Sequence, residues 1–285
     1  MKTDIKDDLI IILKGFIIGS SMSVPGISGG TMAILLGIYD KLIGSISNFF
    51  SDIKGNSIFL FKALLGTFLG IGSLAFVIQW LLLKYPIYIS FFFLGAVIGG
   101  VPALFKKTKE KTLKLSSILY MILGFLTVIF ISSIPIGSFN IVSGTGFVHY
   151  LMVLITGVII AIALILPGIS TSHMLLILGM YDTLLKAITT FDILYIGILG
   201  VSTVIGVFLI TKPIEWTMNT FTKQTYFVII GFVLGSTAEI FKDKILPAVP
   251  QDPSIFWWFS TFVISLITFI VGYRAISSLS RFSND

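Results

Sequence analysis

The sequence PGISGGTM at Pro25–Met32 returns 142 residues later as PGISTSHM at Pro167–Met174. The likeness runs on to Leu42 and Leu184, and the shared positions include Pro, Gly, Ser, Tyr and Asp as well as apolar residues. Each copy is a helix breaker followed by hydroxyl residues, within sequence apolar enough for a bilayer. A repeated break of this kind in a membrane protein points to a binding site at membrane depth.

The overall composition is that of an integral membrane protein. Hydrophobic residues make up 56% of the 285 residues and charged residues 11%, with a mean hydropathy of +1.05. A soluble domain carries about a quarter charged residues. The chain has no cysteine, which excludes disulfides, thiolate nucleophiles and cysteine-bound metals. With only two histidines we expect no metal site, and the mixed-charge N-terminus indicates no removable signal peptide.

Six stretches are apolar over about the ~20 residues that a helix needs to cross a bilayer. Most arms that flank the repeated motifs are shorter, roughly 16 residues or ~24 Å, against a hydrocarbon core of ~30 Å. We therefore predict that each motif forms the turn of a re-entrant helical hairpin; two tilted full spans per motif are the alternative. The predicted hairpins cover residues 9–46 and 147–190, and the predicted spans cover residues 58–83, 86–105, 115–136, 193–211, 225–241 and 254–276.

The distribution of basic residues predicts how the chain lies in the membrane. Five lysines between Lys106 and Lys114 surround a single acid, Glu110, and mark this loop as cytoplasmic. The connection at residues 137–148 has no Lys or Arg. Counting spans outward from the basic loop predicts a multi-pass protein of the cell membrane with both termini in the cytoplasm.

The duplication and the span count together predict the architecture. Residues 1–140 form a first half with three full spans after its hairpin, and residues 147–285 form a second half of the same kind. Because three is odd, the second half enters the membrane upside down. The predicted fold is therefore an all-α polytopic membrane protein built from two inverted repeats, the architecture of alternating-access transporters. A second set of matches supports it: Trp80, Gly95, Gly99, Phe105 and Lys106 recur as Trp216, Gly231, Gly235, Phe241 and Lys242.

The two hairpin tips have the chemistry of an anion site. A Pro-Gly pair ends each first arm, and the helix N-terminus that follows presents free backbone N–H groups and a partial positive charge. Two such ends that converge predict a ligand with negative charge and several acceptor oxygens; phosphate fits best, and chloride or a carboxylate fits less well. The alternative is a structural kink whose backbone groups are satisfied by Ser and Thr hydroxyls. The predicted turns are Pro25, Gly26, Pro167 and Gly168, and the predicted phosphate-binding residues are Ser28, Gly29, Gly30, Thr31, Ser170, Thr171, Ser172 and His173.

Six further residues are candidates for gating or ion coupling, each with a plainer alternative. Two aspartates lie ~13 Å along the second arms, where solvated helix ends are the alternative. Two repeated tyrosines are expected at the membrane interface, or in a packing contact. One glutamate near the end of its span is interpreted as a surface acid rather than a coupling site, and one arginine as a cytoplasmic anchor or a head-group ligand at the inner mouth. The two aspartates are Asp40 and Asp182, and the two tyrosines are Tyr39 and Tyr181. The glutamate is Glu239, and the arginine is Arg274.

The run Val24–Met32 with Gly37-Ile38-Tyr39, echoed by the second copy, resembles the bacterial polyprenyl-phosphate transporter family over essentially the whole chain. This resemblance implies that the partner is undecaprenyl phosphate, moved from the outer to the inner leaflet so that the lipid carrier of cell-wall glycan synthesis is recycled. The second copy departs from the family pattern: it reads Ser-Thr-Ser-His where a glycine-containing Ser-Gly-Ser tip is expected.

The expected mechanism holds the phosphate between the two tips while the halves rock and the tail stays in lipid. Inward movement of a negative head group is opposed by an inside-negative potential, so we expect no cofactor but possible coupling to H⁺ or Na⁺, with His173 as a candidate proton carrier. The chain has no nucleophile with base and basic clamps, so we do not expect an enzyme, and nothing suggests nucleic-acid binding. An ion-coupled transporter of a small soluble anion is the alternative function.

Overall fold

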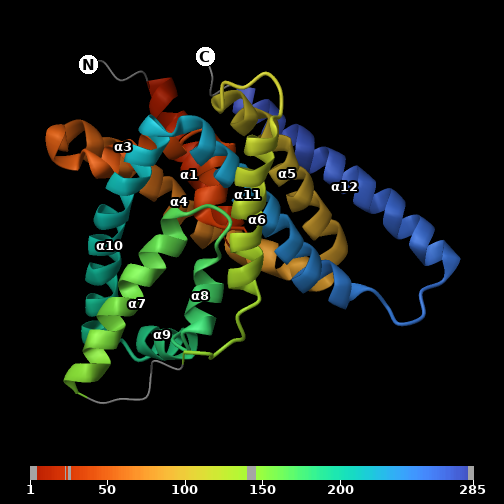
Figure 1. The fold of residues 1–285 in the computed structure, drawn as a ribbon. Helices are drawn as coiled ribbons and strands as arrows, with labels where there is room; N and C mark the ends of the chain where they lie inside the picture. The colour runs from red at the N-terminus through yellow and green to blue at the C-terminus, as the bar shows by residue number, and fades with distance from the viewer. Residues whose placement is uncertain (1–4, 23, 25–26, 140–145, 282–285) are drawn as a thin grey trace.

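The computed structural model describes residues 5–22, 24, 27–139 and 146–281, and every regular element within these ranges is a helix (Figure 1). Seven described helices are long and apolar enough to cross a membrane, which confirms an all-helical, multi-pass membrane protein. They are α4 (Ile53–Lys84), α5 (Pro86–Lys107), α6 (Leu115–Ser132), α7 (Phe147–Ile165), α10 (Ile193–Thr220), α11 (Thr222–Ile240) and α12 (Ile255–Arg281).

Six of the seven correspond to the predicted spans, with shifted ends. The prediction at 193–211 is too short, because α10 continues past Lys212 and through Pro213 to Thr220. Helix α11 is extended by a π-helical turn, η2 (Phe241–Ile245), and a 3₁₀ turn, η3 (Leu246–Ala248). The seventh, α7, is the first arm of the second predicted hairpin, the one arm whose apolar stretch is longer than those of the other arms.

Further helices surround both repeated motifs. The first copy has α1 (Ile5–Ser21), α2 (Gly29–Leu35) and α3 (Tyr39–Ser47), followed by the 3₁₀ turn η1 (Phe49–Ser51). The second copy has α8 (Thr171–Ile177) and α9 (Tyr181–Thr189) after α7. Pro25 and Gly26, the first predicted turn, lie outside the described residues.

Each predicted second arm is in fact two helices. The break falls at Gly37 in the first copy and at Gly179 in the second, with φ of +67° and +70°. Glycine adopts this left-handed conformation without steric cost and commonly ends a helix there. The prediction that Asp40 and Asp182 lie ~13 Å along continuous helices is therefore wrong, since both stand in the first turn of a separate helix.

The long helices pack in corresponding pairs. Helix α1 packs against α4 as α7 packs against α10, and α5 packs against α12 as α11 packs against α6. The last two pairs each join a helix from the first half of the chain to one from the second. Glycines permit the close approach: a Cβ at Gly95 would lie 2.0 Å from the carbonyl oxygen of Phe269. Small residues at such contacts are typical of helix packing in membranes.

The beginning of α1, the end of α12 and the α5–α6 connection lie at one end of the molecule, and α9 lies at the other (Figure 1). The turn between α7 and α8 lies between these ends, and α7 and α8 run back and forth as the two arms of a hairpin. Helix α2 is enclosed by protein, with Gly30–Leu35 all buried. Irregular backbone at membrane depth is tolerated where other parts of the protein cover it.

Candidate functional site

Both repeated motifs begin their second arm with a serine cap. The Ser28 hydroxyl accepts a hydrogen bond from the Thr31 N–H at 3.1 Å, and the Ser170 hydroxyl accepts one from the His173 N–H at 3.3 Å. Each serine has extended backbone dihedrals, as an N-cap requires. In both copies the second arm therefore begins directly after a capping serine.

The structure brings the two tips together. The Gly168 N–H donates to Thr31 Oγ1 at 2.8 Å and to Ser28 Oγ at 3.2 Å. The Tyr39 hydroxyl donates to the carbonyl oxygen of Ile165 at 3.0 Å. Gly168 has φ of +79°, and a Cβ there would lie 2.4 Å from the Phe232 carbonyl oxygen, so only glycine fits this turn. We call these three hydrogen bonds the tip contact.

The tip contact engages the hydroxyls that were predicted to bind phosphate in the first half. Thr31 is fully buried and Ser28 is buried. A Cβ at Gly30 would lie 3.0 Å from the Ile165 carbonyl oxygen, so the glycine permits the approach of the second tip. Gly29 is half-buried and lies against Met22. In this conformation the first tip therefore faces the second tip.

A polar cavity of about 940 Å³ lies beside the second tip. Ser170, Ser172 and His173 line it; Thr171, also predicted as a ligand, is not among its lining residues. The Nε2 atom of His173 and the Oε2 atom of Glu239 are buried and have no hydrogen-bond partner among the described residues. Buried polar atoms without a hydrogen-bond partner are rare in native proteins and point to a bound group or a functional role.

Residues at the end of α11 and in η2 also line the polar cavity. Glu239 is 6% exposed and lines the cavity, so its interpretation as a surface acid is wrong. Lys242, Asp243 and Lys244 follow it in the lining and were not predicted as site residues. All three lie in the π-helical turn η2, and such turns occur often at functional sites. The recurrence of Lys106 as Lys242 was the one sequence signal that could have found them.

Two of the other candidates lie at or near the tips. Tyr39 is 3% exposed and belongs to the tip contact, so the expectation of an interfacial position is wrong and the packing alternative holds. Its repeat partner Tyr181 is half-buried and lines the polar cavity. The two repeated tyrosines therefore have different surroundings: Tyr39 is packed within the protein, whereas Tyr181 lines a cavity.

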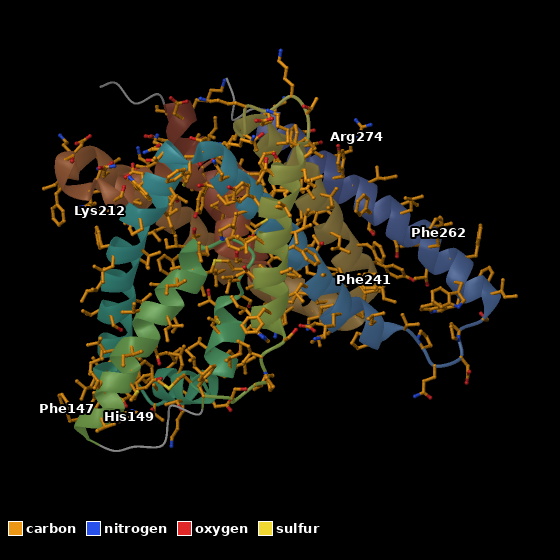
Figure 2. The ribbon with its side chains drawn as sticks, in the orientation of Figure 1. Phe147, His149, Lys212, Phe241, Phe262 and Arg274 are labelled. Carbon is orange, nitrogen blue, oxygen red and sulfur yellow. The ribbon has the colours of Figure 1, made fainter. Side chains whose placement is uncertain are left out.

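The remaining candidates lie away from the polar cavity. Asp40 is exposed and forms an ion pair with Lys107. Asp182 is exposed at the start of α9. Arg274 is exposed on α12, toward the end of the molecule where α1 begins (Figure 2). Within the described ranges, no three His, Asp or Glu side chains are grouped so that they could hold a metal ion.

Polar links join the two halves of the chain near the basic loop. Glu110 pairs with Lys223 of α11 at 2.6 Å, and the hydrogen bond from Lys223 lowers the pKa of this carboxyl. The Asn48 side chain donates to Glu215 of α10 at 2.8 Å. The end of the molecule that carries the basic loop is therefore held together across the halves. The ends of α6 and α11, which line the polar cavity, lie beyond the α7–α8 turn, toward the other end (Figure 1).

Comparison with known proteins identifies the family of the chain. A family model described as undecaprenyl phosphate translocase-like matches residues 18–254. The chain is similar to a polyprenyl-phosphate transporter of Vibrio cholerae, with 36% identity over 250 residues that cover 81% of this chain and 77% of the relative. It is also similar to a polyprenyl-phosphate transporter of Staphylococcus aureus, with 34% identity over 289 residues that cover 97% of each. No solved structure matches significantly. The chain belongs to the undecaprenyl phosphate translocase-like family.

Proposed function

We propose that this protein moves a polyprenyl phosphate, undecaprenyl phosphate, from the outer to the inner leaflet of the cell membrane. The observation that carries the proposal is the polar cavity beside the second tip, in a chain of this family. The names of the two relatives support the same substrate class. The protein acts as a translocator and leaves the lipid chemically unchanged.

The lining of the polar cavity suits a phosphate monoester. Such a head group carries about −1.5 to −2 charges near neutrality and offers three acceptor oxygens. The hydroxyls of Ser170 and Ser172 can donate to it, since a serine that accepts one hydrogen bond keeps its own proton for another. His173 lines the same cavity. Lys242 and Lys244 line the same cavity and supply positive charge, beside the carboxyl groups of Glu239 and Asp243.

The corresponding helix pairs support an inverted repeat with two re-entrant hairpins. Placing the basic loop in the cytoplasm puts both termini there and turns the polar cavity toward the outer leaflet. The tip contact then closes the inner side of the site. In an inverted repeat the two halves exchange roles when the protein opens inward: Tyr181 takes the packed position that Tyr39 holds now, and the first tip becomes accessible to the phosphate. This exchange is alternating access.

Transport in this direction needs a driving force. Moving a charge across the membrane costs ~2.3 kcal/mol per 100 mV, so an inside-negative potential opposes inward transport of the phosphate by roughly 4 kcal/mol per 100 mV. Co-transport of H⁺ or Na⁺ offsets this cost. His173 and Glu239, with unsatisfied polar atoms in the same cavity, are the groups through which we expect the coupling.

The test is leaflet exchange of labelled undecaprenyl phosphate in liposomes that contain the purified protein. We expect Ser170→Ala to slow exchange by removing a donor, and Gly30→Leu to stop it because the new side chain meets the Ile165 carbonyl. Gly72→Ala, at a position with open space around it, serves as the matched control and leaves exchange unchanged. Saturable uptake of a soluble anion without lipid movement would overturn the proposal, and so would release of free phosphate.

A further inference from the structure

An apolar groove of about 340 Å³ lies beside the polar cavity, between α5, α12 and the turns η2 and η3. Its walls are strongly aromatic, with Phe91 of α5, Phe241 of η2, and Trp257, Trp258 and Phe262 of α12. Phe241 and Phe262, labelled in Figure 2, come from different walls of this groove. The mechanism proposed above assigns no role to it.

The π-helical turn η2 separates the groove from the polar cavity and contributes to both. Lys242 and Lys244 line the polar cavity, whereas Phe241 and Ile245 line the apolar groove. Successive Cα atoms are 3.8 Å apart, so the charged wall and the apolar wall are joined within one turn of helix. A molecule with an anionic head and an apolar chain therefore meets both environments across this single segment.

The groove exists because α5 and α12 are closely packed along only part of their length. At Gly272 a Cβ would lie 1.9 Å from the Phe92 carbonyl oxygen, so the helices touch there. Toward the beginning of α12, the small side chains of Thr261 and Ser265 line the groove. Their hydroxyl oxygens are buried and have no hydrogen-bond partner among the described residues, unlike those of most buried serines and threonines.

We propose that this groove binds the isoprenoid chain of the polyprenyl phosphate, next to its phosphate in the polar cavity. The inference rests on the proposed function. The groove, of about 340 Å³, is far smaller than the whole polyprenyl chain, so it holds only the isoprene units next to the phosphate. The rest of the chain lies in the bilayer. A polyprenyl phosphate has one chain to place in the groove, whereas a glycerophospholipid has two. A branched isoprenoid chain with fixed double bonds also loses less conformational freedom on binding than a saturated chain does.

The experiment uses the purified protein in nanodiscs and follows the fluorescence of its tryptophans, two of which line the groove. The probes are inorganic phosphate, geranyl phosphate with two isoprene units, and decyl phosphate with the same number of carbon atoms, ten, and no branches. Thr261→Phe fills the groove. Val263→Phe, on the opposite face of α12 and outside the lining, is the matched control. Val249→Phe fills the groove from another wall and replaces Thr261→Phe if that variant does not purify as a folded protein.

We expect the wild type to bind geranyl phosphate more tightly than decyl phosphate. Thr261→Phe should weaken geranyl phosphate binding about tenfold, equivalent to ~1.4 kcal/mol, and leave inorganic phosphate binding unchanged. Equal affinities for the two ten-carbon probes, or an unchanged affinity in the filled variants, would overturn the groove assignment. Leaflet exchange of undecaprenyl phosphate is measured in parallel: its absence in the wild type refutes the proposed function, whereas normal exchange with a filled groove refutes the chain site alone.

Discussion

At the scale of single residues, the Tyr39 hydroxyl makes one of the three hydrogen bonds of the tip contact. Tyr39→Phe keeps the buried ring but removes the hydrogen bond to Ile165 and leaves a buried carbonyl oxygen without its partner. We expect a loss of about 1–3 kcal/mol in the free energy of unfolding, seen as a lower melting temperature in detergent. Tyr181→Phe removes the same hydroxyl from the cavity wall and should change the melting temperature much less. Equal effects of the two changes on the melting temperature would show that the Tyr39 hydroxyl does not stabilise the tip contact.

Residue chemistry also predicts how transport depends on the proton gradient. His173 stands at the position that Thr31 holds in the first copy, and its Nε2 lies buried at the polar cavity. His173→Gln retains a hydrogen-bonding side chain but cannot take up a proton near neutrality. Leaflet exchange by this variant should therefore respond less to an imposed pH difference across the liposome membrane. An unchanged response would exclude His173 as the proton carrier and leave Glu239 as the candidate.

At the scale of elements, close helix packing depends on which face of a helix a glycine occupies. A Cβ at Gly66 of α4 would lie 2.1 Å from the Ile12 carbonyl oxygen, whereas a Cβ at Gly72 would meet nothing within 4 Å. We expect Gly66→Ala to separate α1 from α4 and to cost about 1–3 kcal/mol of stability. Gly72→Ala should be neutral or stabilising by up to about 1 kcal/mol, since alanine favours helix more than glycine does. Thermal unfolding of both variants measures the difference, and a neutral Gly66→Ala would contradict it.

At the scale of the whole molecule, the ion pair between Glu110 and Lys223 holds the two halves together beside the basic loop. Because Lys223 lowers the pKa of Glu110, the stabilisation that the ion pair gives is fully present above the ordinary glutamate pKa of 4.5. It is lost as the pH falls through the lowered pKa of Glu110. At neutral pH the pair is fully formed. Removing it should therefore favour the state in which this end opens and the polar cavity closes.

The absence of native cysteine makes this shift measurable. A Ser172→Cys variant places one thiol in the polar cavity, where a membrane-impermeant maleimide added outside can label it. Adding Glu110→Gln should slow labelling by about two- to fivefold, because a single ion pair at the surface contributes little to the stability of one state. Lys212→Gln, which removes an exposed charge at the same end of the molecule, should leave the rate unchanged. Faster labelling after Glu110→Gln would contradict alternating access with the assigned orientation.

Much of the fold could be predicted because membrane insertion depends on local sequence. A run of apolar residues forms a helix wherever it lies in a bilayer, and a serine before a helix caps it through atoms three residues away, as Ser28 and Ser170 do. The boundaries were less predictable. Gly37 and Gly179 end their helices because they adopt a left-handed conformation, which an apolar pattern does not reveal.

The sequence by itself determined the membrane class, the duplicated broken helices and the resemblance to a family, since each follows from composition or from matching letters. Only the tertiary structure decided that the first tip is engaged by Gly168, that Glu239 is buried, and that η2 faces a polar cavity on one side and an apolar groove on the other. The physical reason is distance along the chain. The hydroxyl of Thr31 and the N–H of Gly168 are 137 residues apart, and whether they meet depends on how four pairs of long helices pack, not on the residues around either one.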